Sequence, residues 1–408
     1  MLTITFQDIA LPLLYSHCRI STLAALRKFT CHLYRSDQKW DSIRRIPYST
    51  PGRWVTSLDI SDLNIASQSD ICLVDTWLAT IFPLLPFLVH LRLSSSMQLS
   101  RRTMGALGRR DGVSRLRSLK GIKYDVTDES FRQNIIPTIN DPLTELVQNC
   151  VGLEELEILG AGLDDADVQV MSSMGTSIYD HHDFIKTLPP SPLNLPNLHT
   201  LTILSTPSSD LLLRLITTPL PALRNVVMTP YGDIPPPVSL IKPFLAAHGN
   251  EIRTLVHSTP KSWPTVVLPP PSDLFYLLPR LTALSFENIP TPFPLIPPPN
   301  LSSPSFSERQ VRHSCNDIGG SGVECCGHPL VSIWVPRPTL ALREAIITLI
   351  PSLPHLREVR ARDIRWAVKG MSERAREAGF QGEMRAWRLM LGRHKVKMLD
   401  ALGKEEGI

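Results

Sequence analysis

Apolar and polar residues recur along this chain in one short pattern, apolar-x-x-apolar-x-apolar. It stands clearly at "VTSLDI", "LVHLRL", "LEELEI", "LHTLTI", "LRNVVM" and "LTALSF", and more weakly at "LRSLKG", "IRTLVH", "LVSIWV" and "LREVRA". Its period of two predicts short strands with inward leucines and outward intervening residues. The expected inward residues at the strand centres are Leu58, Leu91, Leu119, Leu156, Leu201, Val226, Leu255, Leu284, Ile333 and Val359.

Short helices are predicted between these strands because capping residues precede apolar runs. We expect helices to begin at Asp141-Pro142, Ser209-Asp210, Ser239 and Thr339, and to end before Pro219, Gly249 and Pro351. The shorter intervals between strand centres run from 25 to 33 residues. Strands and helices alternating at this spacing predict parallel strands joined by crossovers and stacked repeat on repeat.

The repeats resemble the leucine-rich repeat family over roughly residues 53–363. The resemblance implies an α/β solenoid with a curved parallel sheet and outer helices. Family members often have an Asn just after each strand. Here only Asn64 and Asn288 occupy such a position, and this predicts irregular repeats. An ordinary doubly wound α/β domain is the alternative, although such a sheet usually has longer helices and fewer prolines than the 37 of this chain.

The N-terminal stretch "ALPLLY", Ala10 to Tyr15, is similar to the segment that follows the F-box in many fungal F-box proteins with leucine-rich repeats. The C-terminal "LREVRARDIRWAV" resembles the tails of such proteins. No F-box is visible, so we expect that module to be lost, to be highly degenerate or to lie upstream. Residues 1–50 are then an N-terminal cap, 51–363 the solenoid with a Pro/Ser/Gly-rich insertion at 290–329, and 364–408 a basic capping helix.

Composition indicates a folded protein, with 43% hydrophobic residues and a net charge of +4. No secretory signal or membrane-spanning run is evident. Seven scattered cysteines fit reduced thiols, so we expect a cytoplasmic or nuclear location.

Charge alternates in blocks along the chain. Residues 101–123 carry eight Lys/Arg against Asp111, residues 145–167 carry seven acids and no Lys/Arg, and residues 356–397 are basic again. We interpret these runs mainly as solvated faces. Nucleic acid is not expected as a partner, because aromatic residues are not interleaved with the cations of 101–123. The segment "GEMRAWRLMLGRHKVKMLDAL" predicts an amphipathic helix with Met384, Trp387, Leu391 and Val396 on one stripe.

Candidate catalytic chemistry is sparse. The sequence has no phosphate-binding loop, nucleophile elbow or zinc-protease motif, so we expect no enzyme activity and no cofactor. A possible metal cluster comprises His313, Cys315, Cys325, Cys326 and His328, but its ligands lack paired C-x-x-C spacing and are interpreted as a loop. His181, His182 and Asp183 are interpreted in the same way.

The outward strand residues are the predicted partner-binding residues, because the concave face of a solenoid binds extended partners. They are Asp59, Arg92, Lys120, Glu157, Thr202, Val227, Val256, Ser285, Trp334 and Arg360. The family resemblance implies a substrate-recognition component of a cullin-RING ubiquitin ligase. It would hold a protein substrate, and would bind a Skp-type adaptor only if an F-box is present upstream. The alternatives are a repeat scaffold unrelated to ubiquitination and, last, a cryptic enzyme.

Overall fold

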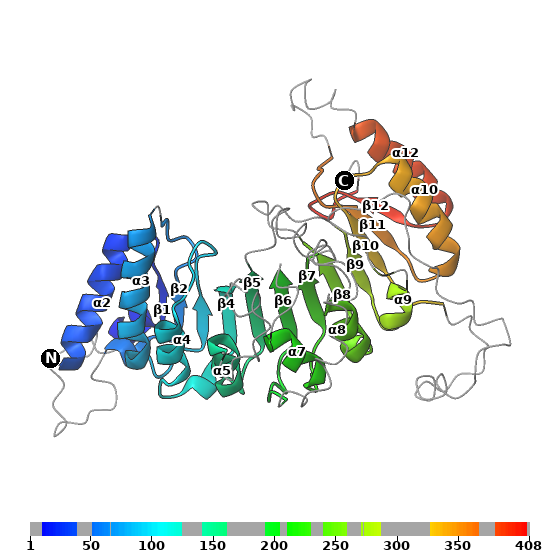
Figure 1. Ribbon diagram of the computed structural model, residues 1–408. Coiled ribbons are helices and arrows are strands. Elements are labelled where there is room, and N and C mark those ends of the chain that lie inside the picture. Colours follow the sequence, from blue (N-terminus) through cyan, green and yellow to red (C-terminus); the bar gives the residue numbers. More distant parts are fainter. Residues whose placement is uncertain are drawn as a thin grey trace, which may run out of the picture. The chain divides into compact units, whose positions relative to one another are not determined.

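The computed structural model divides the chain into two compact units. The residues it describes are 10–38, 51–65, 67–124, 141–160, 192–204, 210–229, 240–258, 271, 273–286, 327–366 and 380–405 (Figure 1). The N-terminal unit comprises Met1–Glu251 with Ser258–Val267, and the C-terminal unit comprises Ile252–His257 with Leu268–Ile408. No described helix combines the length and the apolarity that crossing a bilayer requires.

Parallel strands in chain order form the sheet of the N-terminal unit. They are β1 (His17–Arg19), β2 (Ser57–Asp59), β3 (His90–Arg92), β4 (Ser118–Tyr124), β5 (Glu155–Gly160), β6 (Thr200–Leu204) and β7 (Asn225–Met228).

Helices alternate with these strands and cover one face of the sheet (Figure 1). They are α2 (Leu23–Gln38), α3 (Gln68–Ile81), α4 (Arg101–Gly108), α5 (Pro142–Asn149), α7 (Asp210–Thr217) and α8 (Ile241–His248), with the 3-10 turns η2 (Pro51–Trp54), η3 (Phe82–Leu84) and η4 (Val113–Arg115).

The C-terminal unit repeats the arrangement. Its parallel strands are β8 (Thr254–His257), β9 (Ala283–Ser285), β10 (Ser332–Val335), β11 (Glu358–Ala361) and β12 (Lys397–Leu399), again paired in chain order. Its helical elements are α9 (Leu274–Leu277), α10 (Leu340–Leu349), η6 (Ile350–Ser352) and α12 (Phe380–Arg393).

The register confirms the predicted leucine ladder. In the N-terminal unit the six predicted inward residues from Leu58 to Val226 face one another across successive strands. In the C-terminal unit Leu255, Leu284, Ile333 and Val359 do the same. All ten are at most 1% exposed. Strands that follow chain order within each unit contradict the doubly wound alternative, whose strand order reverses. Each unit is an α/β leucine-rich-repeat-like solenoid with irregular repeats.

Two of the predicted helix starts are confirmed by their caps. The Asp141 carboxylate accepts a hydrogen bond from the Thr144 N–H (2.9 Å), and Thr339 Oγ1 accepts one from the Leu342 N–H (3.3 Å). Ser209 and Ser239 lie outside the described residues. Gly249 follows α8 as predicted, and its N–H donates to Leu245 O (2.8 Å).

The predicted tail helix is correct only in its first part. Met384, Trp387 and Leu391 form a fully buried stripe on α12, but the helix ends at Arg393. Lys395 then takes a left-handed conformation (φ 61°), which stops a right-handed helix. The next residues form β12, whose Met398 aligns with Val359. The expected capping helix is therefore followed by a further strand of the sheet.

Candidate protein-binding surface

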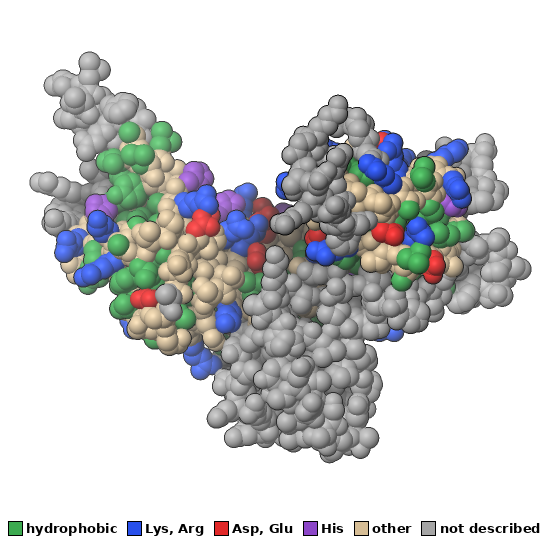
Figure 2. Space-filling view, turned by 90° about the horizontal axis from the view of Figure 1, so that it is seen from above, with side chains coloured by type: hydrophobic (Ala, Val, Ile, Leu, Met, Phe, Trp, Pro, Cys, Tyr) green, Lys and Arg blue, Asp and Glu red, His purple; other side chains and the backbone are tan. Residues whose placement is uncertain are grey.

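The outward residues of β1–β4 form a charged line, which we call the N-terminal row. Register aligns Arg19, Asp59, Arg92 and Lys120 on neighbouring strands. Three of the four were predicted as partner-binding residues. Figure 2 shows basic, acidic and histidine side chains close together on this unit. Because strands lie about 4.8 Å apart, the row presents closely spaced charges, one acidic and three basic.

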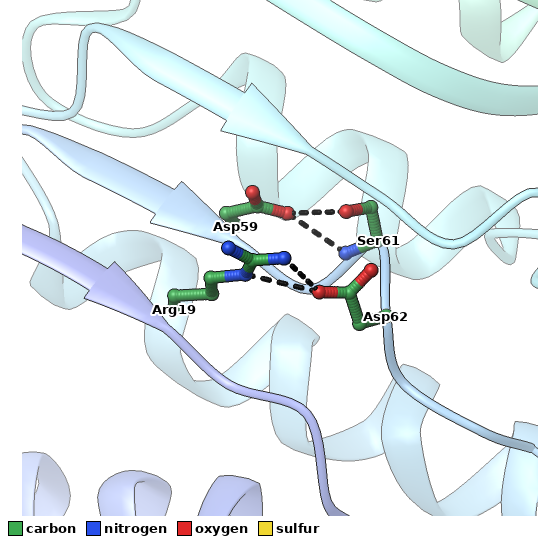
Figure 3. Close-up of polar contacts among 4 residues, drawn as sticks. All are labelled: Arg19, Asp59, Ser61 and Asp62. Carbon is green, nitrogen blue, oxygen red and sulfur yellow. Dashed lines mark hydrogen bonds and ion pairs between the residues drawn. The ribbon is translucent and has the colours of Figure 1, made fainter. Parts of the chain in front are cut away.

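Arg19 and Asp59 are held by two neighbouring residues of the loop after β2 (Figure 3). Arg19 Nε donates to the Asp62 carboxylate (2.9 Å), and Asp59 Oδ1 accepts from the Ser61 N–H (2.9 Å) and hydroxyl (2.7 Å). The bond to Asp62 raises the pKa of Arg19. Partial burial alone would raise the pKa of Asp59, but the bonds from Ser61 and the nearby arginines lower it overall. Both side chains are therefore ionised at neutral pH.

A bulge in β4 separates Lys120 from Glu157, which the sequence placed next to each other. The register shifts between Leu119 and Ile122. Gly121 permits the shift, because its φ is 75° and a Cβ there would lie 2.3 Å from Leu93 O. Lys120 Nζ instead pairs with Glu155 Oε2 (2.8 Å). This hydrogen bond, together with one from Ser118, lowers the pKa of Glu155.

Beyond the bulge, the outward residues are less charged. Glu157, Thr202 and Val227 align on β5, β6 and β7, and each is partly exposed. The three predicted residues are thus brought into one line, but it is offset from the N-terminal row by the β4 bulge. The N-terminal unit offers a charged segment and a more neutral one.

The outward residues of β8–β12 form a second line, which we call the C-terminal row. It aligns Val256, Ser285, Trp334 and Arg360, all predicted, with Leu399 of β12. Ser285 is only 1% exposed, and its hydroxyl accepts a hydrogen bond from Arg362 Nη1 (3.3 Å). At this position the guanidinium of Arg362 is more accessible to a partner than the predicted serine.

Trp334 and Arg360 are fixed against each other in this row. The Arg360 guanidinium carbon lies 5.2 Å from the centre of the Trp334 ring. Trp334 Nε1 donates to Ser332 Oγ (2.7 Å), while Arg360 Nη2 donates to Ala401 O (2.9 Å) and Nε to Asp400 O (3.3 Å). Both side chains are therefore oriented before any partner binds.

Three residues of these rows were missed. Arg19 follows the Cys18 that pairs with Leu58, and the alternation that places Asp59 outward also places Arg19 outward. Leu399 was not predicted as an outward strand residue, because the tail was expected to be one continuous helix. Arg362 lies two residues beyond the predicted Arg360 and reaches back to β8 and β9, where it also donates to His257 O (3.4 Å). No local sequence pattern predicts the contacts of Arg362 with these two strands.

The basic run 101–123 does not form one surface. Arg110 is 3% exposed, and its Nη1 and Nη2 donate to Leu85 O (2.8 Å) and Leu88 O (2.9 Å). Burial lowers its pKa to about 10. Lys120 belongs to the N-terminal row, whereas Arg102 is an exposed residue of α4. The run is divided between the core, the sheet and the helices.

Of the five His and Cys residues considered as metal ligands and interpreted as a loop, only His328 is described, and it is a core residue. His313, Cys315, Cys325 and Cys326 lie outside the described residues, as do His181, His182 and Asp183. His328 is 6% exposed, its ring lies 4.9 Å from that of Phe275, and its Nε2 is 3.0 Å from Leu278 O. Burial lowers its pKa. Within the described ranges, no group of three or more His, Cys, Asp or Glu side chains is placed to hold a metal ion.

Comparison with known proteins gives little. No protein-family model matches the chain, and no curated protein matches it. Among solved structures it is similar to a chain in the crystal structure of the Rad7 and Elc1 complex in yeast. That similarity covers 90% of this chain and 91% of that one, at 12% identity and a TM-score of 0.25. A similarity this low carries no function from that complex to this protein.

Proposed function

We propose that this chain is a non-enzymatic, protein-binding member of the leucine-rich-repeat type. Its outward strand residues hold a protein substrate for a cullin-RING ubiquitin ligase. The observation that carries the binding role is the alignment of outward charged and aromatic side chains into rows on neighbouring strands. Solenoid sheets present such rows to extended polypeptides.

The link to ubiquitination rests on the "ALPLLY" resemblance and gains support from the exposure of its leucines. Leu13 and Leu14 are 70% and 72% exposed, whereas Tyr15 lies against His32 and Trp54 with ring centres 6.0 and 5.9 Å apart. The ring contacts of Tyr15 hold the segment against the cap. The two leucines form an exposed apolar surface against which an upstream F-box could pack. The adaptor contact belongs to that F-box.

Affinity purification from cells tests both halves of the proposal. The protein is expressed with and without its upstream coding sequence, and cullin activity is blocked so that substrates accumulate. We expect a Skp-type adaptor only with the longer form, and a bound substrate with both. Recovery of the adaptor by this chain alone would place a functional F-box within residues 1–50. Absence of cullin components from both forms would refute the ligase role and favour a scaffold.

Variants separate substrate binding from adaptor binding. We expect Arg92→Glu combined with Trp334→Ala to lose the substrate and retain the adaptor in the longer form. Arg102→Glu is the matched control, because Arg102 is an exposed cation on α4 rather than on a strand. Equal loss in the control would mean that the strand rows are not the binding residues.

A further inference from the structure

Although Glu358 lies two residues away on the same face of β11, no carboxylate among the described residues forms an ion pair with the Arg360 guanidinium. Its Nε and one Nη2 proton are used on the carbonyl oxygens of Asp400 and Ala401, and among the described residues Nη1 has no hydrogen-bond partner. The side chain is partly buried, so water screens its charge less than that of a fully exposed arginine. A partner carboxylate would find donors already positioned there, at little cost in side-chain entropy.

Apolar side chains flank this cation in the C-terminal row. Trp334 lies on the neighbouring strand to one side of Arg360 and Leu399 on the neighbouring strand to the other, and both are partly exposed. Neighbouring strands are about 4.8 Å apart. An extended polypeptide advances about 3.3 Å per residue, so side chains one or two residues apart can reach adjacent strands.

We infer that the C-terminal row binds an acidic–apolar segment of the protein partner. One Asp or Glu of that segment pairs with Arg360, and an apolar side chain within two residues of it packs on Trp334. This inference rests on the proposed function, because it specifies which polypeptide the outward strand residues bind. Tryptophan and arginine are also the residues that most often dominate binding energy at protein interfaces.

The row favours a peptide over a nucleic acid. Single-stranded nucleic acid is bound by several aromatic side chains on which successive bases stack. In the C-terminal row the only aromatic residue is Trp334, and its neighbours in register are Ser285 and Arg360. One aromatic ring beside one cation fits an apolar side chain beside a carboxylate.

Selection of random linear peptides on the purified full chain tests the inference. We expect enriched peptides to carry Asp or Glu within two residues of an aliphatic or aromatic residue. For a synthetic peptide of the enriched sequence, Trp334→Ala and Arg360→Gln should each weaken binding at least about tenfold. Arg343→Gln on α10 is the control and should bind like the wild type.

A change in the peptide guards against misfolded variants. Replacing its carboxylate by the amide removes the same contact without altering the protein, and should cause a similar loss. Arg360→Glu should recover binding to a peptide in which Lys replaces the acid. Such a rescue is not expected if Arg360 only holds the C-terminal turn in place.

Two outcomes would overturn the inference alone, and a third would overturn the proposed function as well. Peptides that bind without a carboxylate, and whose binding is lost with Arg92→Glu but kept with Arg360→Gln, would overturn the inference alone. Displacement of the peptide by single-stranded DNA at equal concentration would also overturn it, and would indicate a phosphate-binding surface. Failure to enrich any peptide that depends on an outward strand residue would overturn both.

Discussion

Arg110 offers a sharp test of how the repeats are held together, because its charged side chain is buried although the basic run 101–123 was interpreted as a solvated face. It follows α4 and donates to the carbonyl oxygens of Leu85 and Leu88, the two residues that lead into β3. Both leucines are fully buried. The Leu85 oxygen also accepts a hydrogen bond from the Leu88 N–H (3.2 Å) and keeps it when the guanidinium is removed. The main loss is therefore the hydrogen bond that Arg110 donates to the Leu88 oxygen.

The cost of Arg110→Ala follows from these contacts. A buried carbonyl left without its donor costs about 1–3 kcal/mol, and loss of the packed aliphatic stem adds to this. Relief from burying a charge offsets part of the loss, since burial lowers the pKa of Arg110 to about 10. We therefore expect the free energy of unfolding to fall by about 2–4 kcal/mol.

Urea denaturation followed by far-UV circular dichroism measures this change. Arg109→Ala is the matched control, because Arg109 is the exposed neighbour that caps α4 and whose Nε donates to Gly105 O of that helix (3.1 Å). It should change stability by no more than about 0.5 kcal/mol. Arg110→Lys should fall between the two, since an ammonium cannot span both carbonyls. An Arg110→Ala protein as stable as the Arg109→Ala protein would refute this account of the buried contacts.

Two further predictions concern acid and the C-terminal cap. Burial lowers the pKa of His248, His257 and His328, and it lowers that of His257 to about 3. His257 therefore stays neutral in the folded protein at pH 5, while the unfolded chain gains protons below about pH 6.5. The free energy of unfolding should therefore decrease as the pH is lowered, by about 2 kcal/mol between pH 7 and 5 for His257 alone. In His257→Phe the urea midpoint should depend less on pH, and an unchanged pH dependence would contradict the assignment. The Asp400 carboxylate accepts three backbone hydrogen bonds, from the N–H groups of Trp366, Leu402 and Lys404. Asp400→Ala should lower stability by about 3 kcal/mol and speed amide exchange in β12, whereas exchange as slow as in the wild type would contradict that role.

The ladder and most of the row alignment could be predicted from the sequence because both depend on local alternation. Once Leu58 and its counterparts are assigned inward, the period of two places Asp59, Arg92 and Trp334 outward. That inference needs no knowledge of contacts between distant residues. It holds across irregular spacing between repeats, since the strand pattern itself is unchanged.

What the sequence could not show depends on contacts between distant residues or on a single unusual backbone angle. Arg110 is buried through carbonyls more than twenty residues earlier in the chain. Arg362 covers Ser285 from two strands away. The β4 bulge depends on the left-handed Gly121, and the end of α12 is fixed by the left-handed Lys395. Neither change of direction has a signal in the apolar pattern.

Site-specific photocrosslinking tests the central claim most directly. Benzoylphenylalanine is placed at one position at a time in cells, in the outward rows instead of Arg92 or Trp334 and on the helices instead of Arg102 or Arg343. If strand residues hold the partner, each row position yields a covalently linked polypeptide and the helix positions yield none. Adducts formed only from the helix positions would contradict the account.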